Sequence, residues 1–289
     1  MRAAYPDQSG QVERDGLELG FEVFGHGDPT ILLLPTWTII HSRFWKMQVP
    51  YLSRHYRVVT YDGPGNGRSD RVTDPARYSA DSYAADAVAV LDASAVDRAV
   101  VVGYSLGAQY ALRLATHHPD RVLGVTLVGP ALPLVPPSPE RAAAFEKLRE
   151  PCPEDPQGWD KYNIAYWHQD YADFVEFFFG QLFSEPHSTK PIEDSVSWAL
   201  ETGPEILEAE ANRPLLGISG AQVFEGVKCP ILVVHGTKDR IQPHETGVEA
   251  ARLTNGGLLS MAGSGHAPHV RDPVRFNLVL RDFVERLVS

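Results

Sequence analysis

Short runs of aliphatic residues recur along this 289-residue chain, and each run is closed by residues that favour turns. Near-continuous apolar runs, as opposed to alternating ones, are typical of strands buried on both faces, as in a parallel sheet. Because helical stretches lie between the runs, the chain predicts βαβ units and a doubly wound α/β fold with a mostly parallel sheet. The expected strands cover residues 30–34, 57–61, 99–103, 122–128, 231–234 and 257–260, with an extra early strand or hairpin, antiparallel in sense, at 17–24; the expected helices cover 79–93, 106–117 and 272–288.

One region, residues 130–226, contains no aliphatic run of this kind. It begins with a proline-dense stretch, residues 130–139, which is typical of a linker, and then becomes helical and aromatic. Between Trp159 and Trp198, 11 of the 40 residues are aromatic, against 10% of the whole chain. We interpret the region as a helical cap inserted after the sixth strand of an eight-stranded sheet. The predicted organisation is a core in two parts, residues 1–130 and 227–289, with the cap at 131–226.

Composition and charge limit the classes of partner. The formal net charge is −11, with 43% hydrophobic and 22% charged residues, as in ordinary globular proteins. Because nucleic-acid phosphates require a basic face, we expect no nucleic-acid partner.

No apolar run approaches the ~18 residues of a membrane span, and the N-terminus has no signal-peptide core. Cys152 and Cys229 form no CxxC motif, so we expect a reducing, cytoplasmic compartment. Either a monomer or a homodimer is compatible with the sequence.

The sharpest chemical signal is Gly103-Tyr-Ser-Leu-Gly107, between an expected strand and an Ala-rich expected helix. A serine hydroxyl is a poor nucleophile unless it is held exposed beside a base. The G-x-S-x-G turn achieves this by forcing the serine into a strained backbone, with glycines where side chains would clash. The pattern alone arises often by chance, but its strand–turn–helix context makes Ser105 the candidate nucleophile.

An acid and a histidine should follow the serine in the chain. Asp239 comes just after the expected strand 231–234, and His266 lies on a glycine-flanked loop after the expected strand 257–260. The order Ser105, Asp239, His266 is that of an α/β-hydrolase catalytic triad.

Other acidic and histidine residues have simpler interpretations. Asp62 and Asp70 are expected to structure their own loop, and His235 to satisfy loop carbonyls. His269 follows His266 by three residues but lacks the preceding glycine, so we rank it second as the base. The 11 histidines show no H-E-x-x-H or similar spacing, so we expect neither a metal nor a cofactor.

Together these motifs resemble the α/β-hydrolase superfamily, in its capped esterase and lactone-hydrolase-like form. The resemblance covers about 20–130 and 227–289, whereas the cap matches in position only. It includes a loop similar to the family's D-x-x-G-x-G-x-S pattern at residues 62–69, and the Gly265-His266 and Asp272-Pro273 ending.

The resemblance implies an oxyanion hole of two backbone N–H groups. Leu106, directly after the nucleophile, is one expected donor, and Trp37, by register, is the other. Most relatives carry His-Gly where this chain has Pro35-Thr36. A threonine here is similar to plant-type hydroxynitrile lyases, but those enzymes have a lysine at the position of Ala267.

The implied function is hydrolysis of a small to medium carboxylic ester or lactone by an acyl-enzyme on Ser105. A serine nucleophile argues against the epoxide hydrolases and haloalkane dehalogenases of this fold, which use a carboxylate. Acyl transfer, cyclisation or C–C bond hydrolysis by the same triad remain alternatives, as does a ligand-binding receptor on this fold. The cap's aromatic residues either pack its own helices or line an apolar substrate pocket. The expected pocket residues are Thr36, Tyr104, Tyr166, Trp167 and Phe178.

Overall fold

A computed structural model describes residues 4–289, so the first three residues of the predicted core lie outside the described part. Within that part, eight strands form one sheet in the order β1-β2-β4-β3-β5-β6-β7-β8. The β1–β2 and β2–β4 pairs are antiparallel and all others are parallel. The mostly parallel sheet and the early antiparallel strand are therefore confirmed. The strands are β1 (Gln8–Arg14), β2 (Leu17–Phe24), β3 (Thr30–Leu33), β4 (Arg57–Tyr61), β5 (Ala99–Tyr104), β6 (Val122–Val128), β7 (Ile231–Gly236) and β8 (Gly257–Met261).

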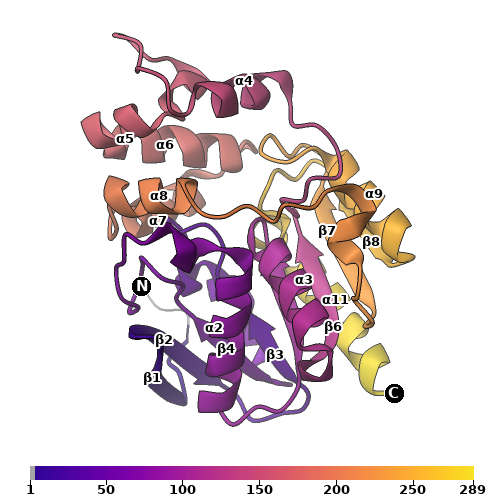
Figure 1. Cartoon of the computed structure of the whole chain (residues 1–289). Coiled ribbons are helices and arrows are strands. Elements are labelled where there is room, and N and C mark those ends of the chain that lie inside the picture. The colour runs from indigo at the N-terminus through magenta and orange to yellow at the C-terminus, as the bar shows by residue number, and fades with distance from the viewer. Residues whose placement is uncertain (1–3) are drawn as a thin grey trace.

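Helices cover both faces of the sheet (Figure 1). Alternate side chains of the central strands enter two separate apolar clusters, one with α2, α3 and α9, the other with α1 and α11. On β5, for example, Val101 faces the first cluster while Val100 and Val102 face the second. The core helices are α1 (Val49–Leu52), α2 (Ala80–Ala93), α3 (Gly107–His117), α9 (His244–Thr254), α10 (Pro268–Arg271) and α11 (Pro273–Val288), with 3-10 turns η1 (Ser42–Met47), η2 (Pro75–Tyr78) and η3 (Pro119–Arg121).

A helical insert separates β6 from β7 and lies across one end of the sheet (Figure 1). This is the end at which the parallel strands finish, because the insert contacts residues that follow β3 and β8. The cap after the sixth strand is thus present, while its boundaries at residues 131 and 226 stay a prediction. The insert contains α4 (Pro139–Lys147), α5 (Ile164–Gln169), α6 (Tyr171–Leu182), α7 (Thr189–Ala199) and α8 (Pro204–Ala211), with η4 (Gly158–Lys161) and η5 (Gly220–Phe224).

The two edges of the sheet depart from the sequence expectation. β8 is not buried on both faces: it pairs only with β7, and Gly257 and Leu258 are exposed. β1 has the sequence QSGQVER and contains no aliphatic run. It is a largely exposed edge strand, and within residues 4–289 it pairs only with β2. Edge strands bury less apolar surface, so apolar runs locate them poorly.

Among residues 4–289, no helix combines the length and the apolar character that a membrane span requires.

Candidate active site

Ser105 lies in the tight turn between β5 and α3, with a φ of 53°. A positive φ is strained for a residue with a side chain and recurs at functional sites. The flanking glycines are required by space: a Cβ on Gly103 would lie 2.2 Å from the Gly107 carbonyl oxygen. One on Gly107 would lie 2.6 Å from the carbonyl oxygen of Pro35. The motif therefore forms the strained elbow that the sequence predicted, packed against the loop after β3.

Three loops bring Ser105, His266 and Asp239 into one hydrogen-bonded chain. His266 Nε2 lies 3.0 Å from Ser105 Oγ, and His266 Nδ1 lies 2.7 Å from Asp239 Oδ2. The loops follow β5, β8 and β7, whose carboxyl ends lie at the same edge of the sheet. The small size of Gly129 leaves room for the imidazole, because a Cβ there would lie 3.3 Å from His266 Nδ1. The three residues that the sequence nominated are thus in contact.

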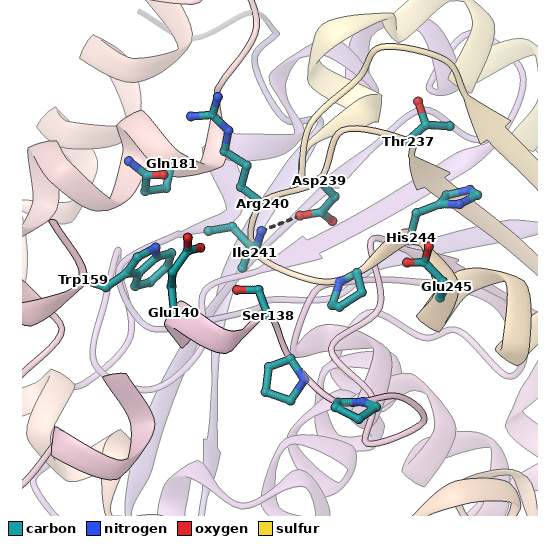
Figure 2. Close-up of a pocket in the computed structure, with 13 residues that line it drawn as sticks. Ser138, Glu140, Trp159, Gln181, Thr237, Asp239, Arg240, Ile241, His244 and Glu245 are labelled. Carbon is teal, nitrogen blue, oxygen red and sulfur yellow. Dashed lines mark hydrogen bonds between the residues drawn. The ribbon is translucent and has the colours of Figure 1, made fainter. Parts of the chain in front are cut away.

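The side chain of Asp239 is fully buried and accepts hydrogen bonds at both carboxylate oxygens. The backbone N–H groups of Ile241 and Gln242 donate to Oδ1 at 2.7 and 2.9 Å (the Ile241 bond is dashed in Figure 2). His266 and His235 both contact Oδ2. Burial alone would raise the pKa of Asp239, but the charge of His266 and the hydrogen bonds from both histidines outweigh it and hold that pKa well below its ordinary value. The carboxylate is therefore held ionised.

His235 is a neighbour of Asp239 that the sequence analysis did not predict. Its Nε2 lies 2.9 Å from Asp239 Oδ2, and only secondarily, at 3.3 Å, from the carbonyl oxygen of Gln242. Both neighbours are acceptors, so Nε2 carries the proton. The expectation that His235 satisfies loop carbonyls was therefore incomplete. The available signal was its place at the end of a buried strand, four residues before Asp239.

His269, the second-ranked base, is placed away from the serine in an aromatic cage. Its ring packs against Phe44, Trp45 and Tyr104, with centroid distances of 5.3, 4.9 and 4.8 Å. Neither ring nitrogen has a hydrogen-bond partner among the described residues. Burial, with a smaller contribution from His266, lowers the pKa of His269 to about 3. A neutral, enclosed imidazole of this kind is a packing residue.

The two rival carboxylates organise loops near β2 and β4, as expected. Asp62 accepts hydrogen bonds from the N–H groups of Ser42 and Arg68, both at 3.0 Å. Asp70 accepts from the N–H of Glu18 at 2.9 Å.

The two candidate oxyanion donors lie on loops that touch. The contact between Pro35 and Gly107 brings the loop after β3 against the start of α3. Within residues 4–289, the backbone N–H groups of Trp37 and Leu106 make no hydrogen bond. Buried N–H groups are normally paired, so unpaired ones beside a candidate nucleophile are available to an incoming oxygen. Thr36 is buried beside them, and its hydroxyl also has no partner in the described chain.

A cavity of about 810 Å³ opens between the insert and the loop that carries Asp239 (Figure 2). None of the five residues that the sequence analysis assigned to a pocket lines it. Trp167 packs within the insert, against Tyr162 and Phe174, as the alternative interpretation of the aromatic residues expects. The cavity is lined by Pro136, Pro137, Ser138, Glu140, Trp159, Gln181, Thr237, Asp239, Arg240, Ile241, Pro243, His244 and Glu245.

The other four predicted pocket residues lie beside His266, on the loop after β3 or in the insert. Tyr104 is fully buried and packs against His266, with centroids 5.1 Å apart. The Tyr166 hydroxyl donates to Asp173 within the insert. Phe178 of α6 packs edge-on against Trp37 at 4.6 Å, beside Thr36. Contact with substrate stays a prediction for all five. Across residues 4–289, no cluster of three or more His, Cys, Asp or Glu side chains is arranged to hold a metal ion.

Known proteins resemble this chain along most of its length. RutD of Caulobacter segnis, assigned as a carbamate hydrolase, is 30% identical over 265 residues, covering 90% of this chain and 94% of RutD. The structure of Est816, an N-acyl homoserine lactone degrading enzyme, matches with a TM-score of 0.75 and 26% identity over 95% of this chain and 100% of its own. The esterase RhEst1 from Rhodococcus sp. ECU1013 has the same fold, with a TM-score of 0.75, 24% identity, and coverage of 97% of this chain and 98% of its own.

The model of the alpha/beta hydrolase fold family matches residues 29–273, which include the elbow, the insert and both loops that carry Asp239 and His266. The chain belongs to the α/β-hydrolase fold family and, with relatives that are esterases and other hydrolases, is a hydrolase.

Proposed function

We propose that this hydrolase cleaves small to medium carboxylic esters or lactones through an acyl-enzyme on Ser105. The observation that carries the proposal is the continuous hydrogen-bonded chain from Ser105 through His266 to Asp239. A strained serine, a base within hydrogen-bond reach and an ionised acid behind the base are the parts that nucleophilic acyl transfer needs.

In the proposed mechanism, His266 Nε2 takes the Ser105 proton as Oγ attacks the acyl carbon. It then returns the proton to the leaving alkoxide, which departs as an alcohol or, from a lactone, stays tethered to the acyl group. Asp239 holds His266 with Nδ1 protonated and stabilises the imidazolium. Water activated by the same histidine attacks the acyl-enzyme, releasing the acid and restoring the Ser105 hydroxyl.

Negative charge that develops on the acyl oxygen requires donors already in place. We assign this role to the N–H groups of Leu106 and Trp37, which are unpaired in the described chain. Removal of one such donor in other hydrolases costs about 10²–10³ in kcat.

The relatives support hydrolysis at an acyl carbon and suggest the substrates to compare. One is assigned to carbamates, one degrades a lactone and one is an esterase. Ala267 is buried directly after His266, where the lyases that share a threonine near the oxyanion loop have a lysine, so hydrolysis is favoured over that lyase chemistry.

Rapid mixing with p-nitrophenyl acetate tests this proposal. We expect a burst of about one p-nitrophenol per active site, a protein mass gain of one acetyl group on Ser105, and slower steady turnover. Ser105→Ala should give neither burst nor acetylation. Turnover of esters without any trapped or kinetically detectable acyl-enzyme at Ser105 would contradict the mechanism. A lactone and a carbamate, run alongside, would rank the substrate classes.

A further inference from the structure

Glu210, at the end of α8, is a buried carboxylate that the triad does not use. Its side chain is fully enclosed, although glutamate is among the residues least often buried. Oε2 accepts two hydrogen bonds from one residue, Thr38: from the backbone N–H at 2.9 Å and from the hydroxyl at 2.7 Å. Glu210 and Thr38 are 172 positions apart in the sequence, so this contact joins the helical insert to the core.

Thr38 directly follows Trp37, the candidate oxyanion donor. The Thr38 carbonyl accepts from Asn66 Nδ2 at 2.7 Å, so both of its backbone polar groups are fixed by buried side chains. The Trp37 carbonyl accepts from the N–H of Ile40 at 2.8 Å, which closes the turn. Among the described residues the Trp37 N–H has no hydrogen-bond partner, although its neighbour Thr38 is fixed on both sides.

The insert also holds Trp37 through its side chain. The indole packs against Phe178 and Phe174 of α6, with centroids 4.6 and 6.2 Å apart. The loop is therefore held from α6 through the Trp37 ring and from α8 through Thr38.

A buried carboxylate is costly unless it is well paired, and one oxygen of Glu210 has no hydrogen-bond partner in residues 4–289. Arg213, one turn further on, contributes an opposing charge, and its guanidinium donates to the Glu210 carbonyl at 2.9 Å. An apolar residue at this position would fill the space without that cost, so the carboxylate is better explained by the loop it binds than by packing alone.

We infer that Glu210 is a positioning residue that fixes Thr38 from the helical insert and so aims the Trp37 N–H at the oxyanion. The inference rests on the proposed function of Ser105 and Trp37. Because Glu210 lies on α8, the Trp37 N–H is held in place only while the helical insert packs against the core. The oxyanion hole therefore needs both parts of the protein. Glu210 acts through Thr38 and does not itself contact substrate.

The test compares three variants on helix α8. Glu210→Ala removes both hydrogen bonds to Thr38, whereas Glu210→Gln retains an oxygen that can accept them. Glu208→Gln is the matched control, because Glu208 lies on the same helix in an exposed ion pair with His168. We expect Glu210→Ala to lower kcat on p-nitrophenyl acetate by about 10- to 100-fold, less than complete loss of an oxyanion donor, with little change in KM. Glu210→Gln should recover most of this loss and Glu208→Gln should show none.

Two further measurements separate positioning from general damage. A trifluoromethyl ketone forms an oxyanion in the site, so its affinity should fall in parallel with kcat/KM in Glu210→Ala. Hydrogen exchange in the peptide that contains Thr38 should quicken in this variant, while the peptides of β5 and β6 stay protected.

Unchanged exchange at Thr38, or an equal loss of activity in Glu210→Ala and Glu210→Gln, would overturn the inference. A loss confined to KM would overturn it as well. If the unmodified protein hydrolyses no ester, the proposed function fails, and the exchange measurement still decides whether Glu210 fixes Thr38.

Discussion

Asp239 and Glu210 are both fully buried carboxylates near the same elbow, yet their surroundings differ. Asp239, on the loop after β7, accepts from two backbone N–H groups and two imidazoles within the described structure. Glu210, in the insert, accepts two hydrogen bonds from Thr38 at a single oxygen. Burial raises the pKa of Glu210, and Arg213, Thr38 and the Tyr110 hydroxyl only partly offset it, whereas the partners of Asp239 reverse the effect of burial.

The difference shows that donors, more than depth, set the charge of a buried acid. The contacts of Asp239 keep it an anion beside His266, as the proposed mechanism requires of the acid. Glu210 accepts two hydrogen bonds from Thr38, and a neutral side chain with a carbonyl oxygen could accept them as well. We therefore expect activity to depend on the charge at Asp239 and on the acceptor oxygen at Glu210.

The largest expected effect is at Asp239. Asp239→Asn should lower kcat by roughly 10⁴, because an amide favours the wrong tautomer of His266. Steady-state ester hydrolysis measures it, with Asp62→Asn as the control, since Asp62 accepts from the loop N–H groups of Ser42 and Arg68 and contacts neither Ser105 nor His266 in the described hydrogen bonds. A greater loss in Asp62→Asn than in Asp239→Asn would show that the acid is wrongly assigned.

By contrast, replacing Glu210 by the isosteric amide should leave the ester hydrolysis rate nearly unchanged. Glu210→Gln is expected to change kcat less than about threefold, because the two Thr38 hydrogen bonds need an acceptor and no charge. The same assay checks this. Losses of similar size in Asp239→Asn and Glu210→Gln would remove the functional distinction between the two acids.

An effect between those of Asp239→Asn and Glu210→Gln is expected at His235. His235→Phe keeps an aromatic ring but removes one donor from Asp239 Oδ2, and should lower kcat about tenfold. His235→Gln, which can present an amide N–H, should recover part of the loss. If both variants retain full activity, His235 only fills space beneath the acid.

Stability should depend on pH in opposite senses at the two acids. The lowered pKa of Asp239 stabilises the fold above the ordinary aspartate value of about 3.9, and this stabilisation is lost as the pH falls through the folded value. The raised pKa of Glu210 has the reverse effect: its contribution is full below the ordinary glutamate value of about 4.3 and is lost as the pH rises through the folded value.

Urea unfolding between pH 3 and 7 measures both effects. Relative to Glu210→Gln, the unmodified protein should lose stability as the pH rises. Relative to Asp239→Asn, it should gain stability as the pH rises from 3 to 5. Slopes of the same sign would contradict the assigned directions.

The same two regions show what the sequence was able to predict. Ser105 and Asp239 follow buried strands, His266 follows the edge strand β8, and the motif around Ser105 is local, so strand ends and chain order were enough to place them. The Glu210 contact depends on how the insert docks against a loop 172 positions away, and no local pattern encodes that docking. The role of His235 could not be predicted for another reason. It lies next to the last residue of β7, and only the fold of the following loop brings Asp239 into contact with its ring.

A fluorophosphonate probe, which reacts with activated serine hydroxyls, shows directly whether Ser105 is the nucleophile. Peptide mass mapping would locate the label while p-nitrophenyl ester turnover is followed on the same sample and on Ser105→Ala. We expect labelling at Ser105, loss of turnover as labelling proceeds, and a decrease in kcat of about 10⁵–10⁶ in Ser105→Ala. Labelling at another residue, or a decrease below tenfold in Ser105→Ala, would contradict it.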